Sequence, residues 1–323
     1  MKKVPPQLLD FIETGNKFII AGHKDEDGDC VGSQLALSSV LRRLGKEAIP
    51  CSSGSFKRTE IKQYEHLFCT TPDEEIRENT RLIITDCSSL ERTGDLAKYL
   101  AGLPAAFIDH HKPDTDECDK AEAVYICEDS PSVTLMILHL ADALGTEINR
   151  EEAELIMLGF CTDTGFYRHL DSASAEAFED VTRLVRAGAS PKKIHDAIYG
   201  GKSLNSRYLL GNILGRTESH FNGKLLISHE EHHENKLYGS ESRDSDVMYQ
   251  LLQSIAGAEA VAVIRQEKPD YCSIGLRSRD QTDVAEIARI LGGGGHKNAA
   301  GAGMEGTIPE IKNKILELFK AVF

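Results

Sequence analysis

Short apolar runs alternate with amphipathic stretches from residue 17 to residue 189. Runs rich in apolar and β-branched residues predict strands at 17–23, 47–51, 81–86, 105–109 and 123–127. Apolar residues at helical spacing predict helices at 32–44, 132–144, 150–161 and 175–189. Such alternation is typical of a doubly wound, mostly parallel sheet covered by helices. We therefore expect an α/β domain over residues 1–189.

A second domain is expected after a connector at 190–203, which contains Pro191 and a pair of glycines. In residues 204–323 the pattern predicts strands near 224–228, 258–266 and 271–277, and helices at 243–255 and 283–291. The last helix runs into a row of four glycines. We expect a smaller C-terminal α/β domain.

The composition is that of a globular protein, since 323 residues with 41% apolar content can form two hydrophobic cores. No apolar stretch approaches the ~20 residues that cross a bilayer, and the first residues lack the apolar core of a secretion signal. The eight cysteines include no CxxC pair. We expect a cytoplasmic protein whose cysteines are packed thiols rather than disulfides or zinc ligands.

The net charge of −14 predicts a surface that repels long nucleic acids and anionic membranes. Aromatic residues make up only 6% of the chain and include no Trp, so a stacking platform for long single strands is not apparent. A short anion held by metal ions is compatible with this charge. A homodimer is allowed, although no repeat or heptad indicates one.

Aspartate and histidine residues follow the ends of several predicted strands. The carboxyl ends of the strands form the edge of an open α/β sheet where ligands bind. The residues expected there are His23, Asp27, Asp29, Asp86, Asp109, His110, His111 and, after an apolar helix, Asp163. So many like charges repel one another unless protons or cations neutralise them. Divalent metal ions neutralise these charges better than protons do.

Carboxylate and imidazole donors without thiolate favour Mn²⁺ or a similar ion over a structural zinc. Asp27 stands four positions and Asp29 six positions after His23, so one turn can present them to two ions. A carboxylate such as that of Asp86 can bridge the ions. Two ions about 3.5–4 Å apart generate a hydroxide and stabilise the attacking and leaving oxygens at phosphorus. For the segment from His23 to Asp29 alone, a solvated turn or a helix cap is the alternative. Taken together with Asp86, the Asp109–His111 segment and Asp163, it favours a metal site.

These motifs resemble those of the DHH phosphoesterase superfamily, and the resemblance spans nearly the whole chain. The stretches GLRSRD (275–280) and GGGGHKNAAGAG (292–303) resemble the DHHA1 substrate-binding domain. Within the superfamily, the chain is most similar to two-domain nanoRNases that are also phosphatases of 3′-phosphoadenosine 5′-phosphate (pAp).

The resemblance implies a role for each residue at the sheet edge. One ion would be held by His23, Asp27 and Asp86, and the second by Asp29, Asp86, His110 and Asp163. Asp109 would orient an imidazole. His111 would contact the bound phosphate and act as the acid for the leaving oxygen.

Substrate contacts are expected mainly from the C-terminal domain. Arg277 suits bidentate contact with a terminal phosphate, and Ser278 follows it. Successive glycines let backbone N–H groups approach an anion. The expected clamp consists of Gly293, Gly294, Gly295, His296 and Lys297. The alternative for the glycine row is a helix cap followed by a flexible turn. Arg168 is a further candidate for substrate contact, and the alternative for it is a surface pair with His169.

One residue departs from the pattern, because Glu26 stands where the superfamily often has proline. Proline would fix φ there, so we expect Glu26 to leave the loop freer and to add charge. We expect metal binding to persist, with a changed metal preference.

The sequence thus predicts a Mn²⁺-dependent phosphoesterase in which a hydroxide shared by two metal ions attacks phosphorus. The expected substrates are short oligoribonucleotides cleaved as by a 3′–5′ exoribonuclease, linear dinucleotides such as pGpG or pApA, and pAp. A stand-alone cyclic-di-AMP phosphodiesterase is the main alternative. An inorganic pyrophosphatase or exopolyphosphatase-like enzyme, a RecJ-type exonuclease and a catalytically silent nucleotide-binding regulator are the others.

Overall fold

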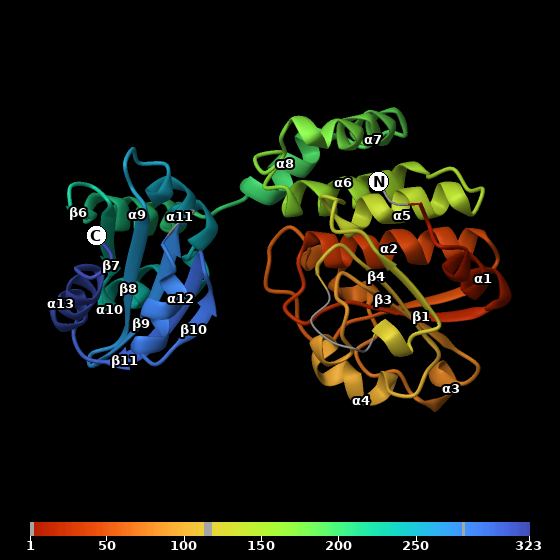
Figure 1. The fold of residues 1–323 in the computed structure, drawn as a ribbon, viewed down its shortest axis with the longest axis horizontal. Coiled ribbons are helices and arrows are strands. Elements are labelled where there is room, and N and C mark those ends of the chain that lie inside the picture. The colour runs from red at the N-terminus through yellow and green to blue at the C-terminus, as the bar shows by residue number, and fades with distance from the viewer. Residues whose placement is uncertain (1–2, 113–117, 280–281) are drawn as a thin grey trace. The chain divides into compact units, whose positions relative to one another are not determined.

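A computed structural model describes residues 3–112, 118–279 and 282–323 (Figure 1). The chain divides into two compact units, residues 1–200 (unit 1) and 201–323 (unit 2). Each unit is described by itself. Helix α8 (Pro191–Tyr199) occupies most of the segment expected to be a connector, and Gly200 and Gly201 lie on either side of the division. Among the described residues, no helix is both long and apolar enough to cross a membrane.

Unit 1 is built on a five-stranded sheet in which every pairing is parallel. The strands are β1 (Lys17–Ala21), β2 (Glu47–Cys51), β3 (Arg81–Thr85), β4 (Ala105–Asp109) and β5 (Ala123–Ile126). All five fall within the predicted ranges or match them. Apolar residues run continuously along them because both faces of the sheet are covered.

Helices cover this sheet on two sides, as expected for a doubly wound fold (Figure 1). Ile20 of β1 packs toward one face and Ile19 toward the other. The first face carries α1 (Pro6–Thr14), α2 (Gly28–Arg43), α5 (Val133–Ala143) and α6 (Arg150–Asp163). The second face carries α4 (Ala97–Leu100), near the short α3 (Glu74–Arg77). Helix α7 (Ala175–Arg186) packs on α6.

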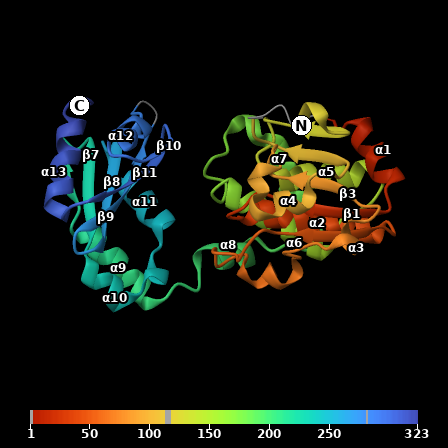
Figure 2. The ribbon, with the colours of Figure 1, turned by 90° about the horizontal axis from the view of Figure 1, so that it is seen from below.

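The strand order β2-β1-β3-β4-β5 places β1 and β3 side by side at the centre of the sheet (Figure 2). The connections reverse direction between these two strands. In doubly wound sheets such a switch point opens a crevice at the carboxyl ends of the strands, where ligands bind. The segments that leave β1 and β3 carry His23 and Asp86.

Glycines allow α2 and α6 to approach each other closely beneath this crevice. A Cβ atom on Gly28 would lie 2.4 Å from the hydroxyl of Thr162, and one on Gly32 would lie 2.6 Å from the carbonyl of Leu155. A Cβ atom on Gly159 would lie 2.8 Å from the carboxylate of Asp29. Only glycine therefore fits these three positions without a shift of the backbone or of the site.

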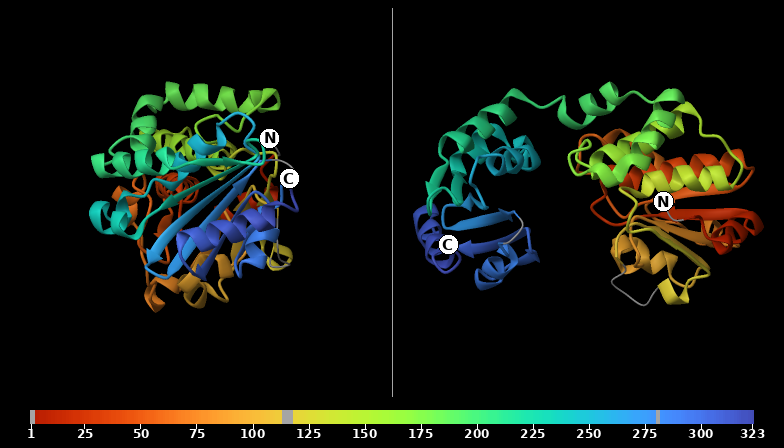
Figure 3. Two further views of the ribbon diagram at one scale, coloured as in Figure 1. Left: turned by 90° about the vertical axis from the view of Figure 1, so that its left-hand side faces the viewer. Right: turned by 45° about the horizontal axis from the view of Figure 1, so that its top comes forward.

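Unit 2 contains a mixed six-stranded sheet of order β10-β11-β9-β8-β7-β6, whose strands fan out in the left-hand view of Figure 3. Its strands are β6 (Glu218–His220), β7 (Leu225–Glu230), β8 (Ala260–Lys268), β9 (Tyr271–Ser278), β10 (Gly294–His296) and β11 (Ala299–Glu305). Only the β7–β8 pairing is parallel.

Two helical layers flank the sheet of unit 2. On one face lie α12 (Val284–Ile290) and α13 (Ile308–Phe319), and on the other α9 (Leu204–Gly215) and α11 (Ser245–Gln253), with α10 (His232–Tyr238) beside α9. The row of glycines after α12 is divided: Gly292, at φ 81°, ends the helix as a cap, and Gly294 and Gly295 lie in the edge hairpin β10–β11. It pairs Gly294 with Gly301 and Gly295 with Ala300.

We predict that Gly159→Ala destabilises the protein by about 1–3 kcal/mol, because the added methyl group overpacks the contact of α6 with Asp29 and Thr134. Gly211→Ala on α9 is the matched control, since a Cβ atom there meets no atom within 4 Å. The control should stabilise by about 0.4–1 kcal/mol. Urea unfolding measures both, and a Gly159→Ala variant as stable as the wild type would contradict the packing described.

Candidate metal centre

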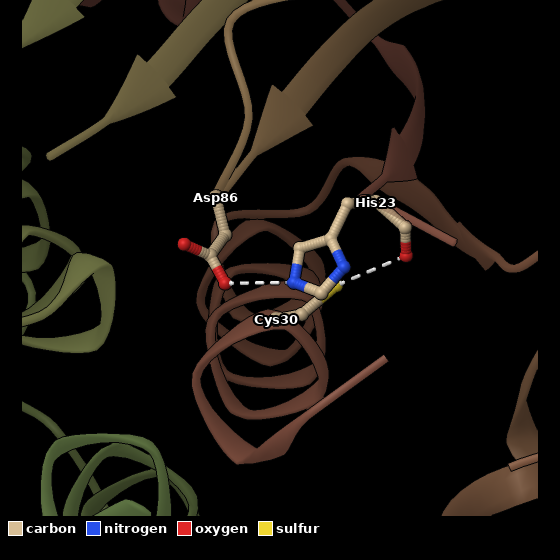
Figure 4. A group of neighbouring side chains, drawn as sticks. All are labelled: His23, Cys30 and Asp86. Carbon is tan, nitrogen blue, oxygen red and sulfur yellow. Dashed lines mark hydrogen bonds and ion pairs between the residues drawn. The ribbon is translucent and has the colours of Figure 1, made fainter. Parts of the chain in front are cut away.

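Asp86 lies at the middle of the cluster, directly after β3, with its backbone in the left-handed region at φ 62°. Its carboxylate is buried and lies among three imidazoles. Oδ2 is 3.3 Å from Nε2 of His23, and Oδ1 is 3.8 Å from Nε2 of His110 and 3.6 Å from Nδ1 of His111. Figure 4 shows the ring of His23 directed at this carboxylate. Because its two oxygens face different imidazoles, the carboxylate is placed to bridge two cations.

The other nitrogens of the two imidazoles are fixed by the backbone. Nδ1 of His23 is 2.8 Å from the carbonyl oxygen of Lys24, and Nδ1 of His110 is 2.9 Å from that of Ser130. A carbonyl only accepts, so each Nδ1 carries a proton and donates it. Each Nε2 then directs its lone pair into the cluster, which is the tautomer that binds metal.

Asp27 and Asp29 reach the cluster from the first turn of α2. Asp27 is the N-cap of this helix, and its Oδ1 accepts the N–H groups of Asp29 and Cys30. The same oxygen is 3.9 Å from Nε2 of His23. The cap fixes the carboxylate and leaves Oδ2 open for a ligand.

The carboxylate of Asp29 is fully buried against the N-terminus of α5. Oδ2 accepts the N–H of Val133 at 2.6 Å, and Oδ1 accepts the N–H and the hydroxyl of Thr134 at 2.9 and 2.8 Å. Positive partial charge at a helix N-terminus stabilises an anion there. Helix α5 therefore holds Asp29 in a fixed orientation.

Asp163 completes the group at the last residue of α6. Its Oδ2 lies 3.3 Å from Nε2 of His110. Donor atoms of Asp29, His110 and Asp163 all lie within 4.8 Å of one another. The resemblance implies that the carboxylate of Asp86, which lies near both His23 and His110, serves both ions.

Burial and mutual repulsion change the protonation of the carboxyl groups. Burial first, and then the charge of Asp29, raise the pKa of Asp163 to about 7. The same two causes raise the pKa of Asp86 well above its usual range. Without cations the cluster therefore retains protons at neutral pH, as expected for carboxylates that cannot all ionise together.

The donor set fits two divalent cations. Oδ1 of Asp86 and Nε2 of His110 are buried and have no hydrogen-bond partner among the described residues, although such atoms are normally paired. Oxygen and imidazole donors suit Mn²⁺ or Mg²⁺. The first ion would be held by His23, Asp27 and Asp86, and the second by Asp29, Asp86, His110 and Asp163.

Cys30 also lies near His23 and Asp86 (Figure 4). Burial, and then the charge of Asp86, raise the pKa of its thiol well above its usual range. The thiol lies 3.7 Å from the carbonyl oxygen of His23 and 3.5 Å from the side-chain oxygen of Gln34. These contacts are those of the packed thiol predicted from the sequence, and a thiolate ligand is disfavoured.

Asp109 is fully buried at the end of β4 and holds His111. Its Oδ1 accepts the backbone N–H of His111 at 3.0 Å and lies 2.9 Å from Nδ1 of the ring. This hydrogen bond raises the pKa of His111, although burial opposes the change. With Nδ1 engaged, Nε2 of the half-exposed ring is available to a ligand.

The structure corrects the expectation for Glu26, whose loop was predicted to be freer than one containing proline. Glu26 is buried, and its carboxylate accepts a hydrogen bond from the hydroxyl of Ser52. Its neighbour Asp25 pairs with Lys57. The loop between β1 and α2 is therefore tied to the segment after β2.

In unit 2, a pocket of about 390 Å³ contains part of the expected substrate clamp. Arg277, Gly294 and Gly295 line it. Ser245, Tyr249 and Arg265 line it too, and the sequence analysis did not identify them. They lie on α11 and β8, and only the antiparallel pairing of β8 with β9 brings Arg265 near Arg277.

The remaining residues of the expected clamp lie elsewhere. Ser278 is buried, and its hydroxyl donates to the carbonyl of Thr282 at 2.6 Å. Gly293, His296 and Lys297 are exposed and are not among the pocket-lining residues. Arg168, in unit 1, is exposed beside His169. Asp280, the last residue of the GLRSRD stretch, lies outside the described residues.

Two family models match the chain: the DHH family N-terminal domain over residues 17–160 and the DHHA1 domain over residues 235–323. The chain belongs to the DHH/DHHA1 phosphoesterase superfamily. The first model covers the whole five-stranded sheet, and the second covers β8 to β11 of the six-stranded sheet. The family expected from the sequence is confirmed.

Similar proteins share both halves of the chain. The bifunctional oligoribonuclease and pAp phosphatase NrnA of Thermus thermophilus is 29% identical over 92% of this chain and 87% of its own length. An exopolyphosphatase-related protein of Bacteroides fragilis has a TM-score of 0.85 at 22% identity, covering 100% of this chain and 99% of its own. RecJ of Thermus thermophilus in complex with Mn²⁺ has a TM-score of 0.55 at 15% identity, over 98% of this chain and 54% of its own. The two structures establish the shared fold.

We predict that Mn²⁺ stabilises the protein more at pH 8 than at pH 5.5. In the metal-free protein, the raised pKa of Asp163 means that stability is lost as the pH rises from the ordinary carboxyl pKa of about 4 through about 7. Bound cations offset this repulsion and also stabilise by mass action. Thermal unfolding with Mn²⁺ or with chelator, at both pH values, measures the difference.

Asp163→Asn is the control for this experiment, since an amide does not titrate. The pH dependence of the metal effect should become smaller in that variant. An equal shift of Tm by Mn²⁺ at both pH values in the wild type would contradict the assignment of these carboxylates.

Proposed function

We propose that the protein is a two-metal phosphoesterase of short nucleotides: oligoribonucleotides of a few residues, linear dinucleotides such as pGpG or pApA, and pAp. The carboxylate of Asp86, with one oxygen toward His23 and the other toward His110, is the observation that carries the proposal. The similarity to NrnA over most of both chains supports this class of substrate.

The cluster of unit 1 performs the chemistry in this proposal. When bound, two divalent ions, most favourably Mn²⁺, supply the positive charge that activates water and stabilises the oxygens of the transferred phosphate. Asp86 keeps the two donor sets at a fixed separation. Nε2 of His111 contacts the phosphate and donates a proton to the leaving oxygen, while Asp109 holds the ring through Nδ1.

Unit 2 binds the part of the nucleotide that does not react. A pocket of about 390 Å³ is large enough for a nucleoside phosphate. Arg277 lies in it with no carboxylate partner among the described residues. The net charge of −14 disfavours long nucleic acids, so binding energy comes from this local site.

We predict that the purified protein with Mn²⁺ hydrolyses an RNA dinucleotide or pAp faster than cyclic-di-AMP or pyrophosphate. Initial rates of the four reactions, each with a chelator control, test this. Asp86→Ala should abolish turnover, because it removes a donor from both metal sets, while circular dichroism reports the intact fold. Preference for the cyclic compound or for pyrophosphate would reject the substrate assignment, and turnover without metal would reject the mechanism.

We predict that His111→Gln lowers kcat by about 10²–10⁴-fold without loss of metal binding, since it removes the proton donor and no metal ligand. His66→Gln is the matched control, because His66 is an exposed histidine of the same unit. Kinetics and Mn²⁺ titration of both variants distinguish the roles. A His111→Gln variant that loses bound metal would show that His111 is a ligand instead.

A further inference from the structure

Cys51 and Cys69 lie side by side, although residues 52–68 stand between them in the chain. Cys51 is the last residue of β2, and Cys69 forms an isolated parallel bridge with it. In this bridge the N–H of Cys69 donates to the carbonyl of Pro50 at 2.9 Å, and the N–H of Ser52 donates to the carbonyl of Cys69 at 3.1 Å. Cys69 therefore extends the edge of the sheet directly opposite Cys51.

The two thiols lie on the same face of the sheet, because residues opposite each other in parallel pairing project their side chains to one side. Both cysteines accordingly belong to the apolar cluster of the second face, together with Ile84 and Leu100. Burial, and then the charge and hydrogen bonding of the Cys69 thiol, raise the pKa of the Cys51 thiol. The two sulfur atoms are thus close enough to act on each other.

The spacing of this pair suits a disulfide. Neighbouring strands lie about 4.7–4.9 Å apart, and the Cα atoms of bonded cysteines are usually about 4.4–6.8 Å apart. Both thiols are reduced in the structure, so the bond requires an oxidant. The backbone pairing can remain in place when the bond forms.

Cys69 is the thiol that an oxidant meets first, since it is partly exposed whereas Cys51 is fully buried. The thiol of Cys51 lies 3.8 Å from the carbonyl oxygen of Ile49, and burial raises its pKa. It therefore stays protonated and shielded from the solvent. Cys51 is placed to react with an oxidised Cys69 rather than with the oxidant itself.

Hydrogen peroxide supplies the two electron vacancies that the bond needs. The thiolate of Cys69 attacks one oxygen, the O–O bond breaks, and the hydroxide that leaves takes up the thiol proton to form water. The sulfur of Cys51 then displaces the hydroxyl group of the sulfenic acid on Cys69. The S–S bond forms, the S–O bond breaks, and the proton of Cys51 leaves with the hydroxyl group as a second water.

Residues 52–68, which this bond would enclose, contact the loop between β1 and α2 at two points. Ser52 donates to the buried carboxylate of Glu26, and Lys57 pairs with Asp25. Closing the segment into a covalent loop restricts the unfolded chain and favours the folded position of Ser52. The bond therefore acts on the loop that carries Glu26.

We propose that Cys51 and Cys69 are a modification site, at which a peroxide forms a reversible disulfide that restrains the loop between β1 and α2. Neither thiol takes part in the proposed hydrolysis. The inference is thus independent of the proposed function, and it goes beyond the packed thiols expected from the sequence.

The first test identifies the bond. Trypsin leaves Cys51 in the peptide 47–57 and Cys69 in the peptide 63–77, each with a single cysteine. After hydrogen peroxide treatment of the folded protein, mass spectrometry should find these peptides joined, about 2 Da lighter than their sum, and dithiothreitol should separate them. Cys69→Ser should remove the joined pair, and Cys118→Ser, at another partly buried thiol of unit 1, should leave it. A different cysteine pair as the main product, or sulfinic acid on Cys69 in place of the pair, would overturn the inference.

The second test measures the effect of the bond, with chelator present so that bound metal does not contribute. The oxidised wild type should have a Tm several degrees above that of the reduced protein. Amide hydrogen exchange of residues 22–28 should be several-fold slower in the oxidised protein. Cys69→Ser should show neither difference, and a Tm close to that of the reduced wild type would show that the variant folds. A joined pair without a rise in Tm, or without slower exchange in this loop, would reject the proposed restraint.

Discussion

Compensation of negative charge at the carboxyl edge of the parallel sheet is the constraint on which the rest of unit 1 depends. Asp29 and Asp86 are buried there, next to Asp27 and Asp163. The fold offers partial compensation from the backbone. The N-terminus of α2 donates to Asp27 and that of α5 to Asp29, while carbonyl groups fix the tautomers of the two histidines. What the backbone cannot supply is full positive charge, and this is why the cluster suits divalent cations.

Local patterns in the sequence were sufficient for the five strands of unit 1, for β7, β8 and β9 of unit 2, and for α2, α5, α6, α7, α11 and α12. Each expected ligand follows a strand or begins or ends a helix, and those boundaries are marked by apolar runs and by caps such as Asn149 with Glu152. The edge hairpin β10–β11 was missed because glycines such as Gly294 and Gly295 have low strand propensity, which the pairing of β11 with β9 and β10 overrides. Tyr249 and Arg265 were missed for a related reason. Their relation to Arg277 exists only across paired strands and a packed helix.

Glu26 shows how a departure from the family pattern is accommodated. Proline would restrict the loop through its ring, whereas here a buried hydrogen bond to Ser52 and the ion pair of Asp25 with Lys57 restrict it through side chains. The restraint thus moves from the loop itself to its contact with the segment after β2. Sequence patterns report such a substitution, but not the partner that compensates for it.

The bonds of Asp29 to the N-terminus of α5 join residues more than a hundred positions apart, with a separation of 104 between Asp29 and Val133. A long loop must close before such contacts are made. The orientation of the Asp29 carboxylate thus depends on the docking of α5 against α2, although the two segments lie far apart in the sequence. A fragment of the chain that ends before residue 133 keeps Asp29 but lacks all three donors that orient its carboxylate.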